Sequence, residues 1–308
     1  MQVFLTYQQQ IDKLKKEKGL LIRDEQYAKA MLQQIGYFSL ISGYKDIFKN
    51  PTTKRYRDNI QFEDIVLLYD FDSKLRELFL SYLLKIENQI KSMLSYAFCE
   101  EYGAEQSAYL NKENYNYVGK RNQKDIDKLV IKLGNLANYN SDYNYINHSR
   151  ERYGNVPLWV LLKAVTFGTI SVMYQVQPSN IKSKISREYN GVNERQLAQL
   201  LRFLVRFRNV CAHGERLFSY RNMESIPDFP AHKKLAMEKA GEHYIGGKHD
   251  LFAVVIALRY LLSEEDFKNF REQLQQQIQV YFKEIHENTE YDILKKMGFP
   301  ENWRDIAK

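Results

Sequence analysis

The longest regular pattern in the chain is an apolar stripe that runs from about Phe62 to Glu101. Apolar side chains recur in it at every third or fourth position, at Leu68, Phe71, Leu75, Leu78, Tyr82, Ile86, Ile90, Met93 and Ala97. This spacing places them on one face of an α-helix, so we predict one long helix, with an interruption near Asp70 left open. A helix of this length in a soluble protein is the spine of a bundle or part of a dimer interface.

A second apolar stripe predicts a helix over 193–213. Asn193 is a favourable residue at a helix start, and Gly214 is a favourable residue just beyond a helix end. The apolar positions between them are Leu197, Leu200, Leu201, Leu204 and Phe207. Burial of this face would hold the last turn of the helix, and the polar residues on it, in a fixed position.

Shorter periodic segments complete a mostly helical pattern. They predict helices over 8–18, 24–34, 36–44 (broken at Gly43), 122–137, 159–174 (begun by Pro157), 251–262 and 264–287. Only 6 prolines and 14 glycines occur in the 308 residues, a composition that favours helices. We therefore expect an all-α fold.

The segment 105–155 differs from the rest of the chain because it is polar. Its run 138–145 is rich in asparagine and tyrosine and has little capacity to form a core. Aromatic side chains mixed with cations could stack on unpaired bases. The cations in question are Lys112, Lys120, Arg121, Arg150 and Arg152. We favour the other interpretation, a surface insert whose tyrosines pack on the bundle.

The net charge of +7 is concentrated in one part of the chain. Twelve lysines and arginines face six acids between residues 180 and 240. Such a concentration indicates contact with phosphate, as in RNA, whereas solvated helix faces are the alternative. No apolar run reaches transmembrane length and no signal peptide is evident, so we expect no membrane contact. The two cysteines, Cys99 and Cys211, suit a reducing compartment, and we expect a cytoplasmic protein.

The candidate chemistry lies at the end of the predicted helix 193–213. Arg208 can grip phosphate oxygens with its planar cation, and His213 can move protons near neutral pH. Together they are the minimum set for cutting RNA without a metal. Five positions correspond to about 500° of helix, so the two side chains diverge by about 140° unless the helix ends or distorts between them.

Other charged and histidine side chains have structural explanations. Asp72 and Arg76 stand one turn apart, as do Glu87 and Lys91, so intrahelical pairs account for them, and contact with an active site is the less favoured alternative. The remaining histidines show no mutual spacing typical of a metal site, and we expect them on the surface or satisfied in the core. They are His148, His232, His243, His249 and His286.

The pattern of Arg208, Asn209 and His213 resembles the Arg-Asn-x-x-x-His signature of HEPN domains, helical nucleotide-binding bundles of which many are ribonucleases. The wider segment Arg208–Leu217 resembles one branch, the abortive-infection (Abi) proteins of the AbiD/AbiF type. Three other stretches resemble that family in the expected order: 35–38 with 42–44, 69–76, and 157–160 with 167–168. The resemblance covers about residues 20–225.

This resemblance implies a HEPN-like helical bundle over 61–225, with a polar insert near 105–155. A helical segment over 1–60 would precede it, and a helical extension over 226–308 would follow. The implied activity is that of a metal-independent endoribonuclease without a cofactor, in which the ribose 2′-hydroxyl attacks the adjacent phosphate.

The resemblance also implies roles for the motif residues. His213 would act as general base or acid, and Arg208 would neutralise charge on the phosphoryl oxygens. Asn209 would bind a phosphate oxygen or orient the histidine. Four further arginines of the basic segment are expected to bind RNA: Arg202, Arg206, Arg216 and Arg221.

One histidine cannot easily serve as both base and acid in a single step. Family members pair two motifs across an interface, and this chain carries one motif, so we expect a homodimer with a composite active site. Proteins of this kind act in abortive infection or as toxins, so an RNA or protein antitoxin is a further expected partner. The first 150 residues and the C-terminal helices are the natural places for it.

Two other classes stay open at this point. One is a non-catalytic HEPN protein that binds RNA or nucleotide, with Arg208 and His213 only ligating phosphate. The other is a helical protein-interaction scaffold, in which Arg208 caps helix carbonyls and His213 satisfies a buried acceptor.

Overall fold

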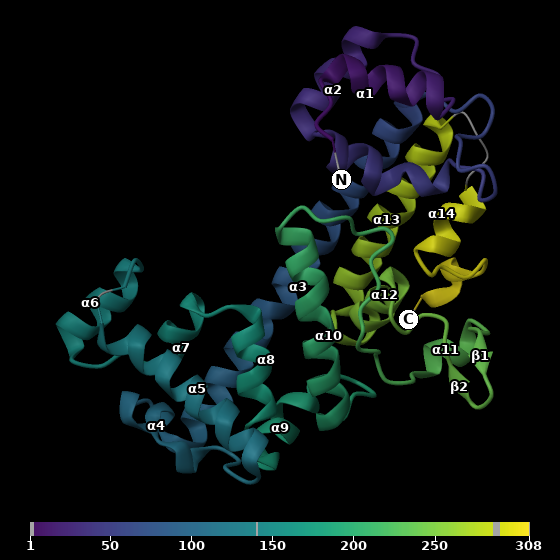
Figure 1. Cartoon of the computed structure of the whole chain (residues 1–308). Helices are drawn as coiled ribbons and strands as arrows, with labels where there is room; N and C mark the ends of the chain where they lie inside the picture. Colours follow the sequence, from purple (N-terminus) through teal and green to yellow (C-terminus); the bar gives the residue numbers. More distant parts are fainter. Residues whose placement is uncertain (1–2, 140, 286–289, 308) are drawn as a thin grey trace.

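The computed structural model describes residues 3–139, 141–285 and 290–307. Helices make up nearly all of its regular structure (Figure 1). Within these ranges, strands occur only in the short antiparallel pair β1 (Lys239–Ala240) and β2 (His243–Tyr244). The expectation of an all-α fold is therefore confirmed.

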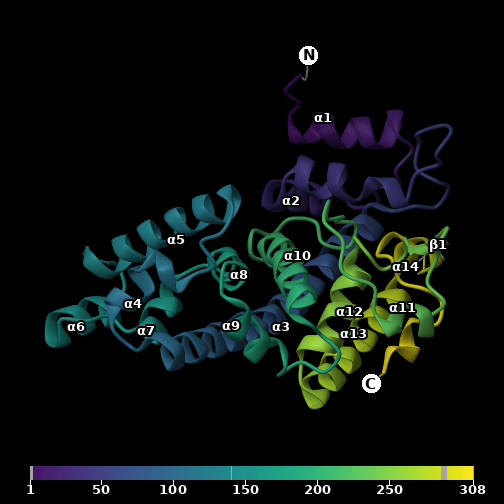
Figure 2. The same ribbon diagram turned by 90° about the horizontal axis from the view of Figure 1, so that it is seen from below.

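Helix α3 (Phe62–Tyr102) is the spine of the molecule and extends along its length (Figures 1 and 2). Its 41 residues correspond to about 60 Å. The helix begins where Gln61 and Asp64 cap each other reciprocally, and it ends at Gly103, whose φ is +90°. It is continuous through Asp70, so the interruption left open by the sequence is absent.

Two helices bury the apolar face of this spine. Helix α13 (Glu264–Glu284) packs along it through aromatic pairs, with Phe71 stacked on Tyr281 at 4.5 Å between ring centroids. Helix α10 (Glu194–Ala212) also packs on α3, and it contacts α8 (Phe167–Gln175) as well. The predicted stripes of α3 and α10 therefore face each other in the core.

The N-terminal segment lies over one end of α3 (Figure 1). It consists of α1 (Tyr7–Asp12), the π-helix η1 (Lys13–Glu17), α2 (Glu25–Ile35), the π-helix η2 (Phe38–Ser42) and the 3-10 helix η3 (Lys45–Ile47). Asp24 caps α2 as expected. The predicted break at Gly43 is wrong, because this glycine has helical angles (φ −69°, ψ −41°) and the chain stays helical through it.

Residues 105–155 form most of an arm that projects from the body in both views (Figures 1 and 2). The arm contains α4 (Gln106–Leu110), η4 (Lys112–Asn114), α5 (Lys120–Asn138), α6 (Asn144–Tyr153) and α7 (Leu158–Leu161). Helix α5 was predicted, but α6 was not, because the polar run 138–145 gives no periodic signal. Ile146 supplies its buried anchor. Asn140, within that run, lies outside the described residues.

The single helix predicted over 159–174 is wrong. The chain forms α7, the 3-10 turn η5 (Leu162–Ala164) and α8, with Val165 extended between them (φ −92°, ψ 151°). The reason is Thr166, whose hydroxyl accepts from the Thr169 amide at 3.4 Å and starts a new helix. Helix α9 (Ser179–Ser186), which the sequence did not predict, then leads to α10.

The C-terminal part closes the bundle on α3. It comprises α11 (Pro230–Lys234), α12 (Leu251–Leu261), α13, α14 (Glu290–Lys296) and η6 (Trp303–Ile306). The predicted pair of helices is present, although α13 ends at Glu284; the expected end at Glu287, and His286, lie outside the described residues. Across the described ranges, no helix has both the length and the apolar character to cross a membrane. The boundaries expected for the HEPN-like bundle, at residues 60 and 225, stay a prediction.

Candidate functional site

The motif occupies the last turn of α10, and the helix ends just beyond it. His213 is the C-cap residue, and Gly214 follows with φ +68°. The Gly214 amide donates to Cys211 O at 3.3 Å, and the Glu215 amide donates to Val210 O at 3.0 Å. This pair of bonds is the Schellman arrangement, which favours glycine at the left-handed position. The predicted stop at Gly214 is confirmed.

The helix is undistorted between the two candidate catalytic residues. The His213 amide donates to Asn209 O at 2.9 Å, which is a regular helical bond, and α10 is α-helical through Ala212. Ideal geometry therefore applies, and the Arg208 and His213 side chains leave the helix axis about 140° apart. Within one chain, the helix does not direct them to one point.

Arg208 is held by a buried carboxylate on the spine. Its Nε lies 3.3 Å from Glu87 Oε2, and Lys91 Nζ lies 2.8 Å from Glu87 Oε1. The Glu87 side chain is 4% exposed, whereas that of Arg208 is 25% exposed. The predicted Glu87–Lys91 pair is thus present, and Glu87 also fixes the arginine while leaving part of it accessible.

His213 is exposed at the helix end, and Asn209 beside it is partly buried. Over the described ranges, neither side chain has a hydrogen-bond partner within the protein. His213 therefore does not satisfy a buried acceptor, which was its role in the scaffold interpretation. Its ring is available to solvent or to a ligand.

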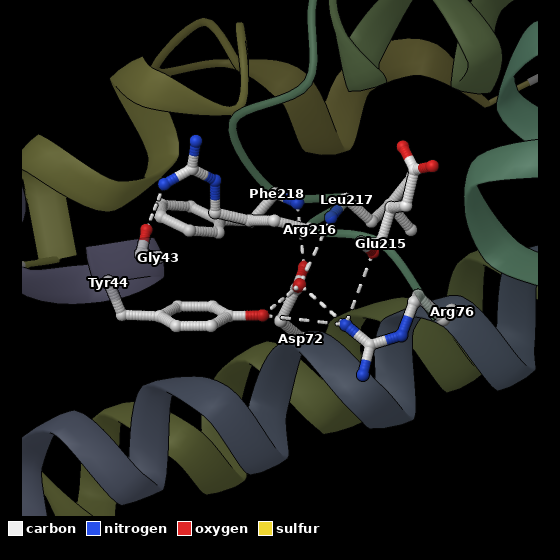
Figure 3. Close-up of polar contacts among 8 residues, drawn as sticks. All are labelled: Gly43, Tyr44, Asp72, Arg76, Glu215, Arg216, Leu217 and Phe218. Carbon is white, nitrogen blue, oxygen red and sulfur yellow. Dashed lines mark hydrogen bonds and ion pairs between the residues drawn. The ribbon is translucent and has the colours of Figure 1, made fainter. Parts of the chain in front are cut away.

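A buried polar cluster fastens the chain immediately after the motif (Figure 3). Asp72 on α3 is fully buried. Its Oδ1 accepts from the Phe218 amide at 2.6 Å, and its Oδ2 accepts from the Leu217 amide at 3.0 Å. The same Oδ2 accepts from the Tyr44 hydroxyl and from Arg76 Nη1, both at 2.7 Å. One carboxylate thus joins the spine, the N-terminal segment and the segment after the motif.

Two arginines add contacts to backbone carbonyls around this cluster. Arg76 Nη1 also reaches Glu215 O at 3.5 Å, and Arg216 donates to Gly43 O (Figure 3). The Asp72–Arg76 pair predicted from spacing is present, but spacing could not reveal that Asp72 binds backbone amides far along the chain. The available signal was that Asp72 and Arg76 lie in one of the four stretches that carry the family resemblance.

The four arginines expected to bind RNA do not form one cluster. Arg202 Nε lies 3.2 Å from Glu224 Oε2 and its Nη1 lies 3.3 Å from Gln175 Oε1, so it is tied to its neighbours. Arg206 is exposed on α10. Arg216 and Arg221 both line one groove.

This groove, which we call the exit groove, has a volume of about 640 Å³. It lies between the segment 34–44 and the segment 214–221, with Tyr69 of α3 also in its wall. Its first residue on the motif side is Gly214, directly after His213. The groove therefore begins where the candidate catalytic helix ends.

Cys211 and the buried histidine have structural roles. Burial raises the pKa of the Cys211 thiol to about 12, so the nucleophilic thiolate is scarce at neutral pH. Burial lowers the pKa of His232, whose Nδ1 accepts from the Phe229 amide at 3.0 Å and whose Nε2 lies 3.1 Å from Gly247 O. Among the described residues, no group of three or more His, Cys, Asp or Glu side chains could hold a metal ion.

Comparison with known proteins places the chain in a family. Searches of curated proteins and of solved structures found no match. A family model described as Abi-like protein matches residues 30–219, which is well over half of the 308 residues. The match includes all four stretches of the predicted resemblance and ends one residue after Phe218, the last residue bound by Asp72. The chain therefore belongs to the Abi-like protein family.

Proposed function

We propose that this protein is a metal-independent endoribonuclease that acts in phage defence by abortive infection. The observation that carries the proposal is the setting of the motif: an exposed His213 fixed at a rigid helix end, one turn beyond an Arg208 that a buried carboxylate holds. Both lie in the most basic part of the chain. A proton-transfer group and a permanent cation suit cleavage of a phosphodiester once both face the same phosphate.

The proposed reaction needs no group from outside the protein and RNA. A base removes the proton from the ribose 2′-hydroxyl, and its oxygen forms a bond to the adjacent phosphorus. The bond from phosphorus to the 5′-oxygen breaks, and an acid supplies a proton to that oxygen. The products are a 2′,3′-cyclic phosphate and a 5′-hydroxyl. Arg208 stabilises the charge on the phosphoryl oxygens, and Asn209 binds an oxygen or orients His213.

A homodimer completes the site in this proposal. The reaction needs a base and an acid, whereas one chain offers one motif histidine, and the regular end of α10 keeps its Arg208 and His213 about 140° apart. A twofold axis beside 208–216 brings a second copy of each residue to the same cleft. His213 of one subunit then serves as base and that of the other as acid.

The family membership supports the biological context. Abi-like proteins take their description from abortive infection, in which an infected bacterial cell stops growing. An active ribonuclease in a healthy cell must be restrained, and we propose an RNA or protein antitoxin as the restraint, acting in the cytoplasm. The first 150 residues, which include most of the projecting arm (Figure 2), and the C-terminal helices are the natural places for such a partner.

The direct test is cleavage of mixed RNA by purified protein in EDTA. Arg208→Ala and His213→Ala are each expected to lower cleavage by at least about a hundredfold, because each removes a group that acts in the transition state. His243→Ala, which removes another exposed histidine, is the control and should cut normally. Wild-type rates in either motif variant, with a matching melting curve, would refute the assigned roles.

A second candidate is a non-catalytic protein that binds RNA or nucleotide. The excess of cations between residues 180 and 240 favours it, because binding of phosphate by lysine and arginine requires no proton transfer. In that case RNA would be retained intact by the wild-type protein, and His213→Ala would change affinity alone. End-group analysis of the RNA after incubation separates the two functions.

A further inference from the structure

We propose that the exit groove binds one unpaired base of an RNA strand together with its phosphate, next to the bond that is cut. This inference rests on the proposed function and deepens it, because it assigns a binding site for the substrate to residues outside the motif. The groove begins at Gly214, and a strand that passes His213 enters it directly. Its volume of about 640 Å³ lies within the roughly 300–1,000 Å³ typical of small-ligand sites.

The floor of the groove is rigid. Tyr44 stacks on Phe218 with 5.6 Å between ring centroids, and its hydroxyl is fixed by Asp72. Tyr220 packs edge-on against Phe207 of α10 at 5.0 Å. These contacts tie the groove to both α3 and α10, so its walls are preorganised relative to the motif.

Phe38 provides an unused aromatic face at the rim. Its side chain is 81% exposed although phenylalanine is usually buried. It belongs to the π-helix η2, a local geometry that is frequent at functional sites. An exposed aromatic ring is a platform for an unpaired base, since every base has a flat face for stacking.

Polar groups of the groove suit the sugar and the phosphate. Two cations line it, and Glu215 is the single acid among the lining residues that the structure describes. Arg216 also donates to Gly43 O, and Arg221 Nη1 lies 3.5 Å from Asp250 Oδ2, but the Arg221 side chain is 54% exposed and can still reach a phosphate. Three serine hydroxyls also line it, those of Ser39, Ser42 and Ser219. Throughout the described part of the chain, none of these hydroxyls has a hydrogen-bond partner. The combination of cations, free hydroxyls and one aromatic platform favours single-stranded RNA over an acidic peptide, which would not need the platform.

The test measures binding without cleavage. Full-length protein carrying His213→Ala is titrated into a fluorescein-labelled, mixed-sequence RNA of ten nucleotides in EDTA. Adding Phe38→Ala should weaken binding by about tenfold, as expected for the loss of one stacked base. Phe38→Trp should retain affinity. Tyr291→Ala, which removes an exposed ring on α14, is the matched control and should bind like the parent.

A second readout isolates the phosphate contact. Arg221→Gln should reduce the slope of log K against log salt concentration by about 0.7, the value for one phosphate contact in a single strand. Lys268→Gln removes an exposed cation on α13 and should leave the slope unchanged. A change in folding alone would not alter the salt slope in this selective way.

The outcomes separate this inference from the proposed function. Unchanged affinity in both groove variants, or no RNA binding by the parent, overturns the groove as an RNA site, whether or not the wild-type protein cuts RNA. Loss of affinity on Phe38→Ala with no cleavage by the wild-type protein supports the groove and refutes the ribonuclease. Loss of affinity together with cleavage by the wild-type protein supports both.

Discussion

Glu87 is the residue on which the geometry of the candidate site depends. Its carboxylate is buried and contacts two cations, Lys91 on its own helix and Arg208 on α10. Burying a carboxylate is costly unless cations and hydrogen bonds compensate. The pairing therefore fixes where the Arg208 guanidinium lies, and Glu87 acts through that arginine as a positioning residue.

Replacing Glu87 by glutamine should separate positioning from folding. Glu87→Gln keeps the shape but removes the charge, so we expect cleavage to fall by roughly tenfold and the free energy of unfolding to fall by about 1–3 kcal/mol. Glu77→Gln, at an exposed position of α3, is the matched control. Full cleavage activity in a destabilised Glu87→Gln protein would show that the ion pair serves stability alone.

Asp72 fixes the position of the segment after the motif, as Glu87 fixes the position of Arg208, and it does so by joining separate elements of the fold. It connects α3 with Tyr44, which follows η2, and with the chain after α10, through hydrogen bonds from the Tyr44 hydroxyl and the Leu217 and Phe218 amides. Asparagine has one acceptor oxygen and presents an amide donor in place of the second. At this site, that donor would face a backbone amide or a cation, which are themselves donors.

Asp72→Asn should therefore loosen the wall of the exit groove. We expect a loss of about 2–4 kcal/mol in the free energy of unfolding and faster hydrogen exchange at the amides of Leu217 and Phe218. Asp70→Asn, two positions away and exposed, should change neither. If hydrogen exchange at 217 and 218 stays as slow as in the wild-type protein, Asp72 does not hold this segment in place.

Asp250 should make stability depend on pH. It caps α12 by accepting from the Ala253 amide at 3.1 Å, and burial raises its pKa from the ordinary value of 3.8 to about 6. The folded state then binds the proton more tightly than the unfolded state. This contribution favours folding below about pH 4 and is lost as the pH rises through 6, a change of about 3 kcal/mol.

Asp250→Asn removes this titration and keeps a good capping residue. The melting temperature of the variant, relative to the wild-type protein, should therefore rise as the pH is raised from 5 to 7.5. A difference that stays constant over that range would mean that Asp250 titrates normally. Arg221 Nη1 lies 3.5 Å from the Asp250 carboxylate, so the comparison also reports on that contact.

Elements with a strong periodic signal could be predicted from the sequence, and elements set by local polar contacts could not. Helices α3, α10 and α13 bury long apolar stripes, so spacing located them within a few residues. The end of α7 and the start of α8 depend instead on the Thr166 hydroxyl, and α6 lies in a polar run. Neither feature produces a recognisable spacing of apolar residues, so the sequence pattern did not reveal them.

At the scale of the whole molecule, the motif could be predicted and its surroundings could not. Arg208 and His213 are recognisable because their chemistry and spacing lie within eight residues. Their supports, Glu87 and Asp72, are more than 120 residues away in the sequence. Only the packing of α10 on α3 brings these supports to the motif. The spacing of charged residues within α3 predicted intrahelical ion pairs and no contact with α10.

The same packing bears on assembly. Because α10 is fixed between α3 and α8, its end cannot rotate to bring Arg208 and His213 of one chain together without disrupting the core. We therefore predict that a second subunit supplies the missing group beside 208–216. Activity should depend on the dimer, with specific activity falling as the protein is diluted below its dimer dissociation constant.

The dependence of activity on a dimer can be checked by measuring the specific rate of RNA cleavage in EDTA as a function of enzyme concentration, together with sedimentation analysis over the same range. If the active site is shared between two subunits, the cleavage rate per chain is proportional to the fraction of dimer. It falls to zero at concentrations where all the protein is monomeric. A monomer that cleaves RNA at the full rate, with activity linear in concentration, would contradict the composite site. A stable dimer that leaves RNA intact would contradict the ribonuclease itself.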